Sequence, residues 1–86
     1  MGKVAVTYRI MPEGTEVDLI QLEKAVREVL GAKLAKLEQK DVAYGLKSLM
    51  AIVVMDDASG ASEAVESSLG SLPGVSTVET QDMSLI

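Results

Sequence analysis

The chain has 86 residues, of which 48% are hydrophobic and 24% are charged, and its net charge is −5 at neutral pH. This length supports one hydrophobic core, and the composition excludes an intrinsically disordered chain. Because cysteine and histidine are both absent, disulfides, thiolate nucleophiles and histidine-based catalysis or metal binding are excluded as well.

No membrane or secretory segment is expected from the hydrophobic runs. The longest of them, Leu49 to Met55, is far shorter than the ~20 residues that a membrane-spanning helix needs. Thr7 and Arg9 interrupt the hydrophobic stretch near the N-terminus, which argues against a signal peptide. We therefore expect a cytoplasmic protein, and its acidic charge argues against nucleic acid as a direct partner.

The first predicted elements are a strand and a helix. Residues 4–11 alternate with a period of two, which predicts a strand with one buried face. Its inward positions are Val4, Val6, Tyr8 and Ile10. Residues 19–30 repeat hydrophobic side chains at steps of three and four, which predicts an amphipathic helix. Asp18, with Gln21 three residues later, predicts its N-cap, and Gly31 its C-cap.

The middle of the chain predicts two further strands. Residues 32–44 are strand-like but irregular, and Leu34 and Leu37 fall out of phase, which predicts a bulge. Lysines in this segment are typical of an exposed sheet edge; they are Lys33, Lys36 and Lys40. Residues 46–55 are hydrophobic on both faces beyond Ser48, which predicts a central strand covered by neighbouring strands and by helices.

The last third of the chain predicts a second helix and a final edge strand. Residues 61–72 have a helical pattern that Pro73 and Gly74 end, and residues 75–85 favour a strand. The resulting order is that of an α+β, ferredoxin-like β-α-β-β-α-β sandwich. We expect a four-stranded antiparallel sheet, with the first and third strands central and with two helices on one face.

The residues alone predict neither an enzyme nor a metal site. Asp56 and Asp57 are adjacent at a strand end and should point to opposite faces, so capping or solvation explains them better than a metal. No phosphate-binding glycine pattern is present, and no histidine could activate a serine. RNA-binding modules share this topology, but the third strand lacks the aromatic residues on which they stack bases.

Tyr44 is one of only two aromatic residues in the chain. It could be an ordinary, partly buried tyrosine at a sheet edge with its hydroxyl in water. It could also be an anchor for a protein partner, because tyrosines often dominate the energetics of an interface. Gly45 beside it would allow close backbone approach or an unusual dihedral angle.

The segment VAYGLKSLMAIVVMDD, residues 42–57, resembles the signature of the elongation factor 1-beta family. In that family a Gly-aromatic-Gly-aliphatic-Lys segment leads into a hydrophobic strand that closes on acidic residues. The first strand ending in MPE, the VDL that opens the first helix and the PGV after the second helix are similar to the short archaeal members. The resemblance covers essentially the whole chain.

The resemblance implies that residues 1–86 form a single guanine nucleotide exchange domain that acts on the GTPase elongation factor 1-alpha during translation. It implies that the aromatic residue, here Tyr44, contacts the GTPase, and that the C-terminal residues lie near its magnesium and phosphate site. The exchange factor would not be an enzyme, would need no cofactor or metal, and would be a monomer when free. The residues expected to bind the partner are Tyr44, Gly45, Leu46, Lys47, Met83, Ser84, Leu85 and Ile86.

The chain departs from the family pattern at two places. Ala43 replaces the first glycine of the signature, and Ser84 and Leu85 stand where relatives generally carry a basic residue. The resemblance therefore does not extend to a terminal positive charge that could disturb the magnesium site. The alternative function is a small regulatory module that binds an amino acid or pairs sheets in a dimer, through the loop at residues 12–18 or the open sheet edges.

Overall fold

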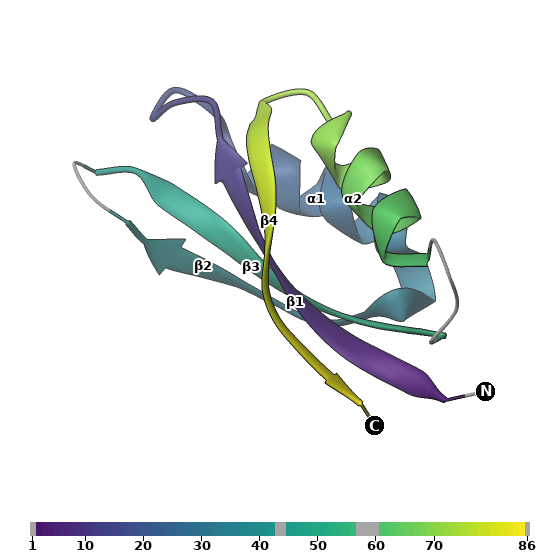
Figure 1. Cartoon of the computed structure of the whole chain (residues 1–86). Coiled ribbons are helices and arrows are strands. Elements are labelled where there is room, and N and C mark those ends of the chain that lie inside the picture. The colour runs from purple at the N-terminus through teal and green to yellow at the C-terminus, as the bar shows by residue number, and fades with distance from the viewer. Residues whose placement is uncertain (1, 43–44, 57–60, 86) are drawn as a thin grey trace.

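The computed structural model describes residues 2–42, 45–56 and 61–85 (Figure 1). Along these residues the elements are β1 (Lys3–Pro12), α1 (Leu19–Leu30), the short 3-10 helix η1 (Gly31–Lys33), β2 (Leu34–Asp41), β3 (Lys47–Asp56), α2 (Ala61–Gly70) and β4 (Val75–Leu85). Apart from the short η1, their order is the predicted β-α-β-β-α-β.

The strands form one antiparallel sheet in the order β2-β3-β1-β4. β1 and β3 are therefore central and β2 and β4 are the edges, as predicted. Both helices cover the same face of the sheet and leave the other face open (Figure 1). This arrangement confirms the predicted α+β, ferredoxin-like fold. Neither of the two described helices has the length and hydrophobicity that crossing a membrane requires.

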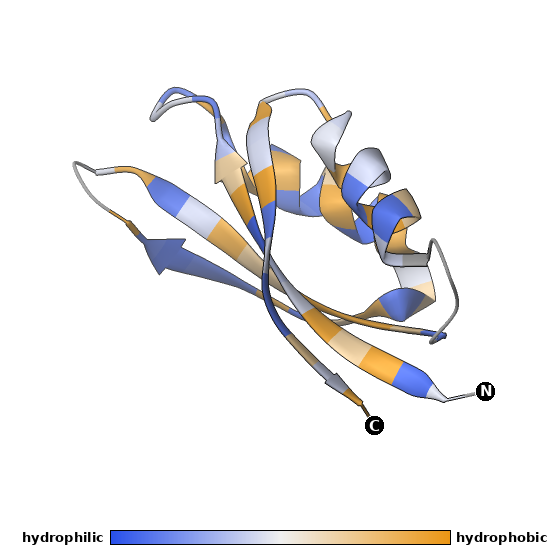
Figure 2. Cartoon of the chain, viewed as in Figure 1, coloured by the Kyte–Doolittle hydropathy of each residue, from blue (hydrophilic) through white to orange (hydrophobic). Residues whose placement is uncertain are grey.

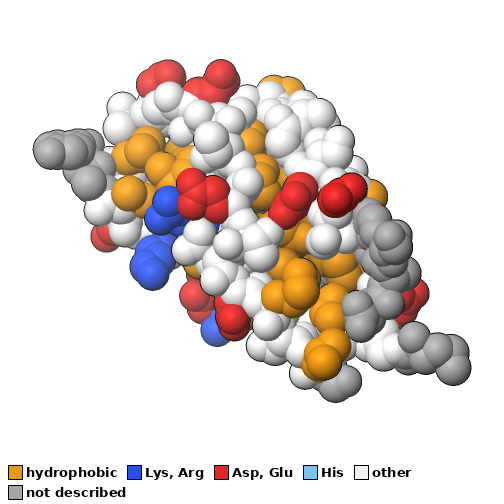
Figure 3. Space-filling view, in the orientation of Figure 1, with side chains coloured by type: hydrophobic (Ala, Val, Ile, Leu, Met, Phe, Trp, Pro, Cys, Tyr) orange, Lys and Arg blue, Asp and Glu red, His pale blue; other side chains and the backbone are white. Residues whose placement is uncertain are grey.

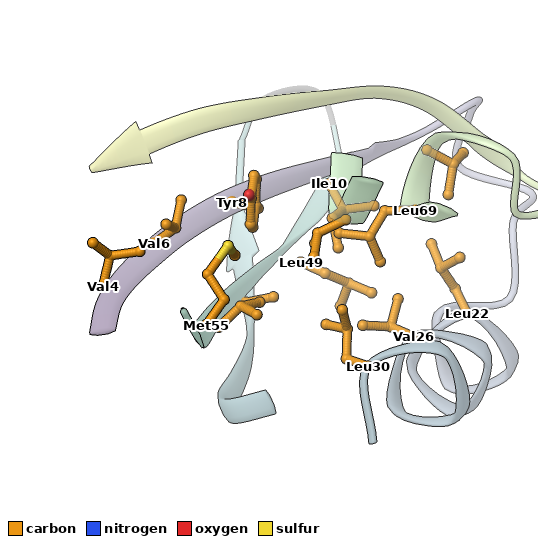
Figure 4. Close-up of a cluster of buried hydrophobic side chains, with 14 residues drawn as sticks. Val4, Val6, Tyr8, Ile10, Leu22, Val26, Leu30, Leu49, Met55 and Leu69 are labelled. Carbon is orange, nitrogen blue, oxygen red and sulfur yellow. The ribbon is translucent and has the colours of Figure 1, made fainter. Parts of the chain in front are cut away.

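The core lies between the sheet and the helices (Figure 4). β1 alternates buried and half-buried side chains, so the predicted inward face is confirmed. α1 contributes one hydrophobic stripe to the same core, as its periodicity predicts. The buried side chains of the two elements are Val4, Val6, Tyr8, Ile10, Leu22, Val26 and Leu30.

The ends of α1 carry the predicted caps. The Asp18 carboxylate accepts hydrogen bonds from the backbone N–H groups of Ile20, at 3.0 Å, and Gln21, at 3.4 Å. These bonds satisfy amides that have no partner within the helix. At the other end Gly31 has a φ of 54° and donates its N–H to the carbonyl of Arg27. Glycine reaches this positive φ without steric cost, which explains why the helix ends there.

β2 is shorter than predicted. It begins at Leu34, because Gly31–Lys33 continue from α1 as the 3-10 helix and place Lys33 outside the strand. The pairing with β3 shifts register between Leu34 and Lys36, which confirms the predicted bulge. The rest of the strand is mostly exposed and hydrophilic (Figure 2), as expected for a sheet edge.

β3 and α2 also differ from prediction. β3 is shifted by one residue, and apart from the buried Ser48 only the face that contacts the helices is fully covered. Its covered positions are Leu49, Ala51, Val53 and Met55, whereas Met50, Ile52 and Val54 are half-buried on the open face. The predicted central position of β3 and the predicted placement of both helices on one face of the sheet are confirmed. α2 ends at Gly70 rather than at residue 72, and Ser71 and Leu72 continue into a turn.

Candidate functional site

The first predicted contact segment lies where β2 connects to β3. Tyr44, its proposed anchor, lies outside the described residues. Gly45 has a φ of 79°, a conformation that favours glycine over any residue with a side chain. Next to it, the Leu46 carbonyl accepts a 2.9 Å hydrogen bond from the N–H of Val42. Lys47 opens β3, and its ammonium lies 4.0 Å from the carboxylate of Asp41.

The second predicted segment is the last part of β4. The side chains of Met83 and Leu85 are 54% and 76% exposed, and Ser84 between them is exposed as well. Ile86 lies outside the described residues. Figure 3 shows hydrophobic side chains at the surface near this end of the chain. Exposed hydrophobic side chains that gather at one place often mark an interaction surface.

The two segments lie at opposite ends of the sheet (Figure 1). In the register, Leu85 is opposite Val4 of β1, whereas Leu49, two residues after Lys47, is opposite Ile10. The six residue steps from Val4 to Ile10 span about 20 Å of strand. The structure therefore does not bring the two predicted segments together, and one partner could contact both only through two separate areas of its surface.

A cleft of about 190 Å³ adjoins the first segment. The β1–α1 loop and the start of α1 form one wall, with Pro12, Gly14, Thr15, Val17 and Leu19. The other wall consists of Gly45, Leu46 and Lys47. The sequence linked residues 12–18 only to the alternative function, a small regulatory module. It did not predict that this loop would share one cleft with Gly45–Lys47, which are expected to contact the partner.

The loop wall of this cleft is held by the turn before β4. The N–H of Glu13 donates to the carbonyl of Gly74 at 2.8 Å. Gly74 has a φ of 88°, and a Cβ built on it would lie 3.1 Å from a methyl carbon of Val17. A side chain at this position would therefore press on Val17 and would also strain the backbone. The close approach of the two loops depends on this glycine.

The other aromatic residue, Tyr8, is fully buried and so is not available to a partner. Its hydroxyl donates to the carbonyl of Ser62 at 3.4 Å, which joins β1 to the first turn of α2. Burial, together with the nearby carboxylate of Glu66, raises the pKa of Tyr8 to about 12. Its role is structural.

Some charged side chains in the described residues form ion pairs at the surface. Arg9 pairs with Glu79 at 3.1 Å, and Lys36 pairs with Glu38 at 2.8 Å, a contact that raises the pKa of Lys36. Within residues 2–42, 45–56 and 61–85, no three acidic side chains lie close enough to hold a metal ion.

Comparison with known proteins gives a consistent result. Residues 5–86 match the family model described as the EF-1 guanine nucleotide exchange domain. The chain is 41% identical over 85 residues to elongation factor 1-beta of the archaeon Methanothermobacter thermautotrophicus, and the match covers 96% of each chain. It is 40% identical to the elongation factor 1-beta of Methanococcoides burtonii, again over 96% of each chain. With the protein of that name from Natronomonas pharaonis it shares 35% identity over the full length of both.

Proposed function

The chain belongs to the elongation factor 1-beta family, whose members carry a guanine nucleotide exchange domain, and from this we propose that it promotes release of GDP from the GTPase elongation factor 1-alpha. The observation that carries the proposal is the family match over residues 5–86, which includes both predicted contact segments. In this proposal residues 1–86 act as one exchange domain, and GTP rebinds once GDP has left.

The proposed activity requires differential binding and no covalent step. A factor that binds the nucleotide-free GTPase more tightly than the GDP-bound form weakens GDP binding by the same ratio, because the two equilibria are linked. A thousandfold ratio corresponds to about 4 kcal/mol, which one aromatic anchor and a supporting rim can supply. The net charge of −5 would also speed association with a basic partner.

We assign the contacts to the two segments at opposite ends of the sheet. At one end Tyr44 is the anchor, and Gly45, Leu46 and Lys47 support it. At the other end the exposed side chains of Met83 and Leu85, with Ser84 and Ile86, contact the GTPase near its magnesium and phosphate site. This second contact is hydrophobic and carries no basic side chain. Once one end is bound, the rigid sheet holds the other at a high effective concentration.

The test is release of a fluorescent GDP analogue from the elongation factor 1-alpha of the same organism. The wild-type protein should accelerate release. Tyr44→Ala should lower the second-order rate constant of exchange by about 30-fold or more, because loss of a hot-spot residue costs about 2 kcal/mol of binding energy. Tyr44→Phe keeps the ring and should retain most of the activity. If the wild-type protein leaves release unchanged at saturating concentration, the proposed function is wrong.

The C-terminal contact has its own matched pair of variants. Leu85→Ala removes an exposed leucine of β4 and should slow exchange. Ile20→Ala removes a similar side chain, 63% exposed on the outer surface of α1, and should leave exchange unchanged. Equal effects of the two substitutions would contradict the assignment of the C-terminal segment, whatever the result for Tyr44.

A further inference from the structure

The size of the cleft beside Gly45–Lys47 limits what it can bind. Its volume is about 190 Å³, below the ~300–1,000 Å³ of pockets that bind small molecules. A cavity of roughly 150 Å³ in a protein core accommodates benzene. The cleft is therefore too small for a nucleotide and has room for a single benzene-sized side chain.

The hydrophobic part of the cleft lining suits an aromatic side chain. Val17 and Leu19 form a hydrophobic wall that packs against the core, and the half-buried Leu46 lies on the other side. Lys47 also lines the cleft, and its side chain is 50% exposed, with only a 4.0 Å contact to Asp41. An ammonium group placed in this way can lie over the face of an aromatic ring and attract it.

The loop wall of the cleft is also formed before anything binds. The bond from Glu13 to Gly74 and the close approach of Gly74 to Val17 fix the loop wall to the β4 side of the molecule. A second bond, from the N–H of Val17 to the carbonyl of Gly14 at 3.3 Å, closes the loop on itself. A partner therefore does not have to order this wall when it binds, which lowers the cost of association.

We propose that this cleft receives an aromatic side chain of the GTPase, and that Val17 is a specificity-determining residue of the exchange contact. The inference rests on the proposed function. The partner is chosen as the occupant because the wall at Gly45–Lys47 belongs to the predicted contact, so a GTPase bound to these three residues covers the cleft. The contact is then reciprocal: the factor inserts its own aromatic residue and receives one in return.

The test compares two substitutions of Val17 with the same substitutions of Val29, a valine that is 41% exposed on α1. Val17→Ala removes methyl groups from the wall, and Val17→Thr keeps the shape but adds a hydroxyl. In the GDP-release assay, each should raise the concentration of factor that gives half-maximal exchange by about tenfold, the effect expected for one or two buried methyl groups. Val29→Ala and Val29→Thr should leave this concentration unchanged.

The possible outcomes separate this inference from the proposed function. Circular dichroism and thermal unfolding of each variant first establish that it is folded. If the wild-type protein accelerates GDP release and both folded Val17 variants match it, the cleft does not receive a partner side chain, although the exchange function stands. If the wild-type protein has no effect on release, the proposed function fails and the docking inference fails with it. Loss in the Val17 variants alone supports the inference.

Discussion

Replacing Tyr8 with phenylalanine removes one buried hydroxyl while keeping the ring that fills the core. In the wild-type protein this hydroxyl donates to the carbonyl of Ser62 at 3.4 Å, a long distance for a hydrogen bond. At neutral pH we therefore expect Tyr8→Phe to lower the free energy of unfolding by only about 0.5–1 kcal/mol.

The effect should change sign at high pH. Burial and the nearby Glu66 carboxylate raise the pKa of Tyr8 from 10.0 to about 12. Between these values the unfolded chain releases a proton that the folded protein keeps, so stability falls as the pH rises. The stability that the neutral, buried Tyr8 hydroxyl contributes is fully present below pH 10 and is lost as the pH approaches 12. The rise in pKa corresponds to at most about 2.7 kcal/mol. Tyr8→Phe has no such loss and should become the more stable protein.

The assay is urea unfolding of both proteins, followed by circular dichroism, at several pH values from 8 to 11.5. The rest of the chain is identical in the two proteins, so the difference between the two free energies of unfolding isolates Tyr8. We expect the wild-type protein to be slightly more stable at pH 8 and less stable at pH 11.5. A difference that stays constant over this range would show that the Tyr8 hydroxyl is not desolvated as described.

Three further variants test the helix cap, the core and the first contact segment. Asp18→Ala removes the acceptor for two backbone N–H groups and should cost about 1 kcal/mol in urea unfolding, and no change would mean that the cap is dispensable. Leu69→Ala empties a fully buried site and should cost about 2–5 kcal/mol, whereas Ile20→Ala should stay within about 0.5 kcal/mol. Gly45→Ala meets no neighbouring atom but must keep a φ of 79°, so it should cost about 1 kcal/mol and also slow GDP release. Unchanged release would show that this backbone conformation does not matter for exchange.

The elements with strong local signals were predicted correctly. The alternation in β1 and the caps at Asp18 and Gly31 depend on neighbouring residues, so the sequence contains the whole signal. The start of β2 was misplaced because the 3-10 helix Gly31–Lys33 has no distinctive pattern. The hydrophobic residues on both faces of β3 correctly predicted its central position, with β2 and β1 as its neighbours.

The candidate site could be predicted only in part. The sequence indicates Gly45 and the residues after it, because the signature is continuous along the chain. It does not contain the register of β1 with β3 and β4, which places the C-terminal segment at the other end of the sheet. It also does not show that Val17 lines the same cleft as Lys47. Both facts depend on pairing between residues that are distant in the sequence.

The pairing of β1 with β4 also has a consequence for folding kinetics. Lys3–Pro12 and Val75–Leu85 are far apart along the chain, so their contacts have a high contact order and should form slowly. Until β4 is in place, one edge of β1 is unpaired and can associate with other chains. The strand that carries Met83 and Leu85 is thus also the one that closes the sheet. The refolding rate of any variant in this strand should be measured before slower exchange is attributed to a lost contact.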